Sequence, residues 1–148
     1  MFDDNCSLHT AAAIYNLLNK AHLTPYDVSN RTGFMEGPVH GAPSIAEMFR
    51  QLAISDGTYT RFDSLDQAEA LMNMRAVGTP FGFGYAPTAG GTGHIIVAIK
   101  SLGTILYRDY QIHERQGPYA PTGIPRASIP NVGYAYFVFR PGIVLPGS

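Results

Sequence analysis

The first half of the chain carries apolar residues at helical spacing, whereas the second half carries short runs of aromatic and β-branched residues. Residues 7–20 combine three consecutive alanines with an apolar stripe and predict a helix. Residues 44–55 and 64–76 each open with a serine followed three positions later by Glu or Gln, a capping pattern that predicts two further helices. The intervening residues 24–43 are rich in Gly and Pro and predict a surface loop.

Beyond Gly78 the pattern becomes that of an extended chain. The predicted strands, all rich in aromatic or β-branched residues, are 81–85, 94–100, 105–107 and 134–139. Residues 101–103 are short enough to join two of these strands as a hairpin. Helices followed by strands predict an α+β fold, with the helices first and an antiparallel β-sheet after them.

The composition fits a single globular domain over residues 1–148 and removes several classes of function. A chain of 148 residues can close one hydrophobic core without metals or disulfides. Its formal net charge of -1 lacks the basic excess of a dedicated nucleic-acid binder. No stretch approaches the roughly 20 apolar residues of a membrane span, and residues 1–5 lack the basic and apolar regions of a signal peptide. We therefore expect no nucleic-acid partner, no membrane insertion and no signal peptide of its own.

The single cysteine, Cys6, lies at the start of the first predicted helix. Unpaired backbone N–H groups and the helix dipole favour negative charge at this end, which suits a thiolate nucleophile. A lone cysteine is more often a small buried apolar residue. The polar run 3–5 directly before Cys6 argues against that interpretation, because a structural cysteine has no reason to prefer this position.

Two further residues could complete a set of nucleophile, base and orienting acid. His94 follows a glycine-rich loop and begins a predicted strand, and Asp109 follows the next strand. The hairpin between these strands would bring both residues to the same end of the sheet. A thiol needs an imidazole within hydrogen-bond reach, and the imidazole needs a third group to hold its ring. We therefore predict Cys6 as the nucleophile, His94 as its base and Asp109 as the residue that orients the base.

Two polar residues could support this site. Gln111 would share a strand face with Asp109 if the chain stays extended, and its amide could serve His94 or the oxyanion. Asn5 is either a helix cap or an oxyanion donor, with the backbone N–H of Cys6 as the other candidate donor. Capping is the simpler role for Asn5.

Metal and nucleotide sites find less support in the sequence. Cys6 and His9 have the C-x-x-H spacing of zinc ligands, and His94 could join them, but no second close pair is present. The loop 86–93 is glycine-rich, yet it lacks the Lys-Ser/Thr pair of a phosphate-binding loop and precedes a strand instead of a helix. We therefore predict no metal and no cofactor.

Three short motifs carry a family resemblance. They are Asp-Asn-Cys at residues 4–6, Gly-His-Ile-Ile-Val-Ala at residues 93–98 and Leu-Tyr-Arg-Asp-Tyr-Gln at residues 106–111. Their order resembles that of the papain-like fold toxin domains of bacterial secreted effectors, a group that includes glutamine deamidases. It resembles more distantly that of the papain-like peptidases that process bacteriocin leaders.

The resemblance implies a papain-like fold, with an N-terminal helical lobe packed on a C-terminal antiparallel β-sheet and the site between them. Cys6 then matches the nucleophile of the family, His94 its base and Asp109 its orienting acid. Gln111 matches the amide that follows the acid. Several relatives carry a glutamine or a glycine upstream of the cysteine for the oxyanion, and no glutamine precedes Cys6 here.

These observations predict a thiol hydrolase that attacks a carboxamide of a target protein through a thioester, with deamidation of a glutamine side chain as the leading reaction. Peptide-bond cleavage is the alternative, because the triad alone does not separate the two reactions. A binding module that retains the fold without turnover is a third possibility. The resemblance further implies a toxin that is delivered as part of a larger secreted protein and acts in the target-cell cytosol. A cognate immunity or inhibitor protein could then exist as a partner.

Overall fold

The computed structural model describes residues 2–34, 39–110 and 122–142. Its α-helices are α1 (Asp4–Asn19), α2 (Pro25–Thr32), α3 (Ala42–Gln51) and α4 (Leu65–Met72), and a 3-10 helix, η1, covers Arg126–Ser128. Its strands are β1 (Phe2–Asp3), β2 (Val39–His40), β3 (Ser55–Phe62), β4 (Pro80–Pro87), β5 (His94–Ser101), β6 (Thr104–Asp109), β7 (Thr122–Ile124) and β8 (Tyr134–Pro141).

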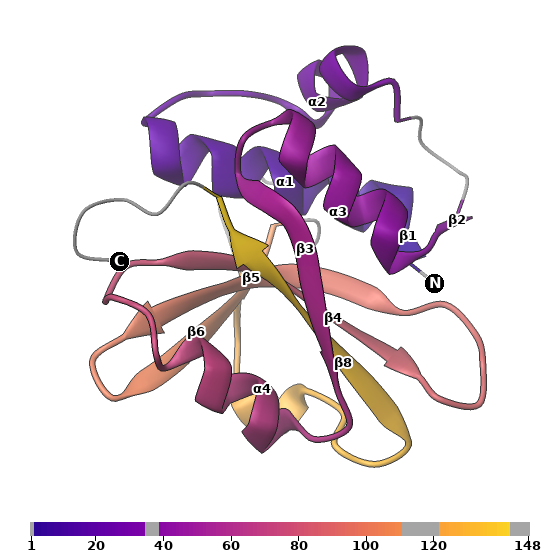
Figure 1. Cartoon of the computed structure of the whole chain (residues 1–148), viewed down its shortest axis with the longest axis vertical. Helices are drawn as coiled ribbons and strands as arrows, with labels where there is room; N and C mark the ends of the chain where they lie inside the picture. Colours follow the sequence, from indigo (N-terminus) through magenta and orange to yellow (C-terminus); the bar gives the residue numbers. More distant parts are fainter. Residues whose placement is uncertain (1, 35–38, 111–121, 143–148) are drawn as a thin grey trace.

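An antiparallel sheet forms the centre of the described structure, and the order of its strands differs from their order along the chain. It has six strands in the order β3-β8-β4-β5-β6-β7, and every neighbouring pair runs antiparallel. Helices α1, α2 and α3 lie over one face of this sheet, and α4 lies over the other (Figure 1). A separate pair, β1 and β2, brings the N-terminal residues beside the segment that precedes α3. The sheet is therefore covered on both faces.

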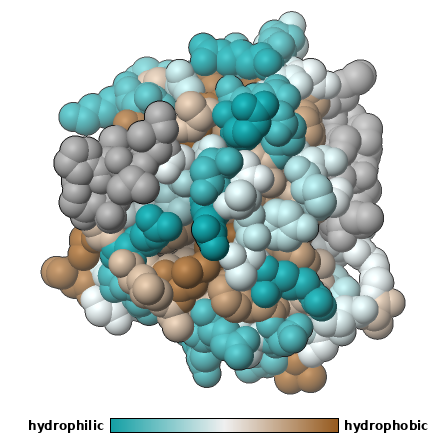
Figure 2. All heavy atoms as spheres, viewed as in Figure 1, coloured by the Kyte–Doolittle hydropathy of each residue, from teal (hydrophilic) through white to brown (hydrophobic). Residues whose placement is uncertain are grey.

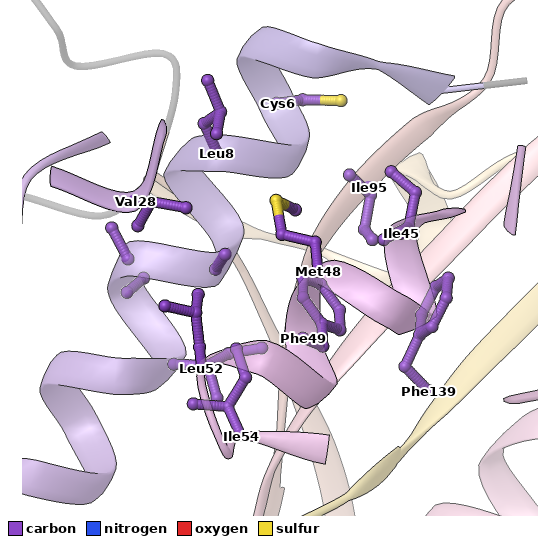
Figure 3. Packing of buried hydrophobic residues seen from close by; sticks show 14 of the residues in the cluster. Cys6, Leu8, Val28, Ile45, Met48, Phe49, Leu52, Ile54, Ile95 and Phe139 are labelled. Atoms are coloured by element: carbon purple, nitrogen blue, oxygen red, sulfur yellow. The ribbon is translucent and has the colours of Figure 1, made fainter. Parts of the chain in front are cut away.

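Two hydrophobic cores explain why the strand sequences are apolar on both sides. In β5, Ile95 and Val97 pack with the residues of α1, α2 and α3, whereas Ile96 and Ala98 pack with those of α4. Alternate residues of a strand point to opposite faces, so a strand that is covered on both faces reads as a continuous apolar run. Figure 3 shows the first core, where Phe49 of α3 packs between α1 and the sheet.

The outer surface combines polar residues with small patches of apolar residues. Figure 2 shows hydrophilic residues interleaved with such patches over the face in view. Among the described residues, Met74, Leu102 and Val132 are large apolar side chains that are 79%, 84% and 83% exposed. None of the described helices is long and apolar enough to cross a membrane.

The predicted α+β class is confirmed, with helices in the N-terminal part and antiparallel strands in the C-terminal part. The predicted hairpin is also present, because Leu102 and Gly103 join β5 to β6, and Gly103 adopts a left-handed φ of 71°. Ser64 caps α4 as its pattern predicts, with its hydroxyl oxygen accepting a hydrogen bond from the backbone N–H of Gln67 at 3.1 Å. The papain-like arrangement stays a prediction.

Other predicted element boundaries are wrong. The segment 24–43 contains helix α2, in which Thr24 and Asp27 form a reciprocal capping box through their side chains and backbone N–H groups. Helix α3 begins earlier than predicted and follows Gly41, so Ser44 is not its cap. Strand β3 was not predicted, because its sequence contains no apolar run and Ser55 is its one buried residue.

Candidate active site

Cys6 is the third residue of α1 and lies in the first turn of that helix. Because α1 begins at Asp4, Asn5 lies inside the helix and not at the predicted cap position. The side chain of Cys6 is 1% exposed. Figure 3 shows its sulfur at the end of the hydrophobic core, on the side of α1 away from Leu8. Backbone N–H groups in the first turn of a helix have no intrahelical partner, so this position favours a negative charge.

The N-terminal strand fixes α1 against the sheet. Phe2 forms a parallel bridge with Gly93, the residue before His94. The ring of Phe2 is 1% exposed and lies edge-on to that of Phe137, with their centroids 5.5 Å apart. It also covers Gly84, where an added Cβ would lie 2.8 Å from two ring carbons. The chain continues from this bridge into α1, so the bridge brings the first turn of the helix to the start of β5.

One hydrogen bond docks α1 on β5, and one close contact fixes the start of β5 against β4. The hydroxyl of Thr10 donates a hydrogen bond to the carbonyl oxygen of Ile95 at 3.0 Å, within the buried interior. At Gly93, an added Cβ would lie 2.6 Å from the carbonyl oxygen of Tyr85 and 2.7 Å from the Cβ of Ala86. Any side chain at this position would therefore displace the start of β5.

His94 and Asp109 are hydrogen-bonded at the ends of neighbouring strands. Nε2 of His94 lies 2.6 Å from Oδ2 of Asp109. An ionised carboxylate can only accept a hydrogen bond, so Nε2 carries the proton and Nδ1 is the ring nitrogen left for another partner. The Asp109 side chain is 5% exposed and the His94 side chain is 30% exposed, so the imidazole is the more accessible member of the pair.

Cys6 is the second partner of the imidazole. Burial lowers the pKa of His94, but hydrogen bonds to the side chains of Asp109 and Cys6, together with their charges, outweigh burial and raise this pKa from 6.5 to about 10. The imidazolium is therefore the dominant form of the ring at neutral pH. The structure thus brings the sulfur, the imidazole and the carboxylate together at one end of the sheet. Their catalytic roles stay predictions.

Tyr85 adjoins the same site and was not among the predicted residues. It is the Cα partner of His94 in the β4–β5 register, and the two rings meet edge to face with their centroids 5.9 Å apart. Burial, followed by the charges of Asp109 and Cys6, raises the pKa of the Tyr85 phenol to about 12, so its hydroxyl stays protonated at neutral pH. The ring of Tyr134 lies beside that of Tyr85, with their centroids 6.2 Å apart. The imidazole is therefore bordered by an aromatic surface.

The remaining predicted residues are less defined. Gln111 lies outside the described residues, and the side chain of Asn5 is not among those that the structure describes. His9 is buried and lines a cavity of about 290 Å³ together with α1 residues, the segment 21–25 and Tyr110. Across the described ranges, no three His, Cys, Asp or Glu side chains gather as metal ligands. The predicted zinc alternative of Cys6 and His9 thus gains no support from the described side chains.

Comparison with known proteins does not define the site further. No protein-family model matches the chain, and no curated protein matches it. The chemistry of the site therefore follows from its geometry alone. That geometry provides a thiol, an imidazole held by a carboxylate, and a neighbouring phenol.

Proposed function

We propose that this protein is a papain-like thiol hydrolase that attacks a carboxamide of a target protein, acting as a glutamine deamidase. The supporting observation is that one imidazole contacts both the side chain of Cys6 and the carboxylate of Asp109. A buried structural cysteine needs no such partners, whereas a thiol nucleophile needs a base, and the base needs an orienting group. The proposal rests on this triad, which joins residues from α1, β5 and β6.

The reaction divides into acylation and hydrolysis. The thiolate of Cys6 attacks the amide carbon, so that a carbon–sulfur bond forms and the carbonyl π pair moves to oxygen. Collapse of this intermediate breaks the carbon–nitrogen bond and releases ammonia, which takes its extra proton from the imidazolium of His94. Water then attacks the thioester while neutral His94 accepts a proton, and the thiolate is expelled to leave a carboxylic acid. Asp109 keeps Nε2 protonated and the ring oriented throughout.

Access to the sulfur supports deamidation over peptide cleavage. Cys6 is 1% exposed and the His94 side chain is 30% exposed, so the imidazole is the more accessible of the two groups. A glutamine side chain carries its carboxamide on a slender methylene chain and can enter a narrow opening. A main-chain amide carries polypeptide on both sides and needs a wider groove. Proteolysis is therefore the second candidate.

Mass spectrometry of cells that express the chain tests the proposal. We expect glutamine-to-glutamate conversion, detected as a mass increase of target peptides, with the wild-type chain and not with the Cys6→Ala variant. New peptide termini that depend on Cys6 would favour proteolysis instead. An identical effect on cells from both chains would contradict the hydrolase proposal and support a binding module that retains the fold. Circular dichroism of the variant confirms that it is folded.

Iodoacetamide labelling tests the nucleophile without a known substrate. We expect alkylation of Cys6 at neutral pH to be faster in the wild type than in a His94→Gln variant, because the variant lacks the neighbouring cation. Equal alkylation rates in the two folded proteins would remove the imidazole from the mechanism.

A further inference from the structure

The phenol of Tyr85 is a polar group at the site that the triad chemistry does not use. It lies on β4 opposite His94, with which it shares a register position and an edge-to-face ring contact at 5.9 Å. The charges of Asp109 and Cys6 both act on it. The phenol therefore borders the base and lies within electrostatic reach of the nucleophile.

We propose that Tyr85 is a further catalytic residue, whose hydroxyl donates a hydrogen bond to the carbonyl oxygen of the bound carboxamide as that oxygen becomes negatively charged. The inference rests on the proposed function, because it requires a tetrahedral intermediate on Cys6. It gives the site an oxyanion donor from β4, on the opposite side of the imidazole strand from β6. Backbone N–H groups in the first turn of α1 are available as a second source of donors.

Two properties suit this phenol to the role. The hydroxyl is a donor at neutral pH, because the ordinary pKa of a tyrosine is about 10 and burial with the neighbouring charges raises that of Tyr85 further, to about 12. The ring is also held in place, because it contacts the rings of Phe83 at 6.3 Å and Tyr134 at 6.2 Å as well as that of His94. Donors that are fixed before the reaction stabilise developing charge best, since no reorganisation is needed when the charge appears.

Tyr85 takes no part in the proton transfers. When the sulfur–carbon bond forms and the π pair moves to oxygen, the O–H bond of the phenol stays intact and only its hydrogen bond to the substrate oxygen strengthens. The proton that ammonia carries away still comes from His94. Loss of the hydroxyl should therefore slow acylation without changing the reactivity of the thiolate itself.

Two small probes separate these effects. Acylation of Cys6 by p-nitrophenyl acetate passes through a negatively charged tetrahedral oxygen, whereas alkylation by iodoacetamide displaces iodide at a saturated carbon and forms no oxyanion. In a Tyr85→Phe variant, we expect the first turnover of p-nitrophenolate release to slow by about 10²–10³-fold. We expect the rate of iodoacetamide alkylation to stay at the wild-type value.

Tyr134→Phe is the matched control, because it removes a hydroxyl from the adjoining ring. We expect wild-type rates with both probes in this variant, and a loss of acylation shared by both variants would overturn the inference. Unchanged acylation in Tyr85→Phe would also overturn it and leave the hydrolase proposal intact. A parallel loss of alkylation would overturn it as well, since the phenol would then act on the nucleophile. If the wild type releases p-nitrophenolate no faster than Cys6→Ala, the proposed function fails, and the inference fails with it.

Discussion

Replacement of Asp109 by asparagine tests the electrostatic coupling within the proposed triad. Asparagine preserves the shape of the side chain and removes its charge. The replacement is best made in a Cys6→Ala background, because the sulfur is the other group that hydrogen-bonds to the imidazole. In this background the hydrogen bond to Asp109 remains and the one to the sulfur is gone. Cys6→Ala and the double variant with Asp109→Asn then differ only in the carboxylate.

The size of the effect follows from the contact itself. The distance of 2.6 Å between Nε2 of His94 and Oδ2 of Asp109 is that of a short charge-assisted hydrogen bond, and such bonds contribute about 1.5–3 kcal/mol. One pKa unit corresponds to about 1.4 kcal/mol, so loss of the carboxylate charge should lower the pKa of His94 by about 1–2. Burial, which lowers this pKa, is then unopposed. We expect the pKa of His94 to be about 1–2 lower in the double variant than in Cys6→Ala, and to lie below 6.5 in the double variant, where burial alone acts on it.

NMR titration of the imidazole nitrogens measures this pKa directly. The chain has five histidines, and the spectrum of a His94→Gln variant identifies the signal of His94. Equal titration midpoints in Cys6→Ala and in the double variant would refute the reasoning, because the carboxylate would then have no control over the ring. Thermal unfolding of both proteins confirms that each is folded over the titrated range.

Stability provides an independent readout with a defined sign. A histidine whose folded pKa exceeds 6.5 stabilises the fold in full below pH 6.5, and this contribution is lost as the pH rises through the folded pKa. For the wild type, in which the folded pKa of His94 is about 10, we therefore expect this contribution to the free energy of unfolding to be lost as the pH rises from 6.5 through about 10. In the double variant the folded pKa is depressed, so the free energy of unfolding should fall as the pH drops below 6.5.

Two further predictions concern contacts at the start of β5, one with β4 and one with α1. Gly93→Ala places a Cβ 2.6 Å from the carbonyl oxygen of Tyr85, and such overpacking costs about 1–3 kcal/mol, so we expect earlier unfolding in urea and slower alkylation of Cys6. A wild-type urea midpoint together with a wild-type alkylation rate would contradict the close contact at Gly93. Thr10→Val removes the 3.0 Å hydrogen bond to the carbonyl oxygen of Ile95 at nearly constant shape, so we expect a loss of about 0.5–1.5 kcal/mol in urea unfolding. An unchanged midpoint would show that this hydrogen bond contributes nothing measurable.

The parts of the fold that could be predicted have local signals. The alanine run of α1, the Ser64 cap of α4 and the short connection 102–103 each lie within a few residues of the structure that they specify. Helix α2 also has a local signal, the capping box of Thr24 and Asp27, but the Gly and Pro around it mask the period. Strand β3 has no such signal, because it lies at an edge of the sheet and is defined by its pairing with β8.

The same distinction applies to the candidate site. His94 and Asp109 could be placed near one another because a short hairpin separates their strands. Cys6 could be identified from its position on a helix, but its contact with the imidazole depends on how α1 docks on the sheet. Tyr85 could not be predicted, because its position opposite His94 depends on the register of β4 against β5 across the segment 88–93, which no local pattern specifies.

The proposed triad is assembled from two parts of the fold that can be displaced separately. The base and the acid lie on β5 and β6, so the 2.6 Å contact of His94 with Asp109 belongs to the sheet. The nucleophile belongs to α1, which reaches the sheet through the Phe2 bridge and the hydrogen bond of Thr10. A change that shifts α1 should therefore separate the sulfur from the imidazole and leave the His94–Asp109 contact in place. In such a variant we expect slower alkylation of Cys6 and a lower pKa of His94, because the imidazole loses the sulfur and keeps its hydrogen bond to Asp109.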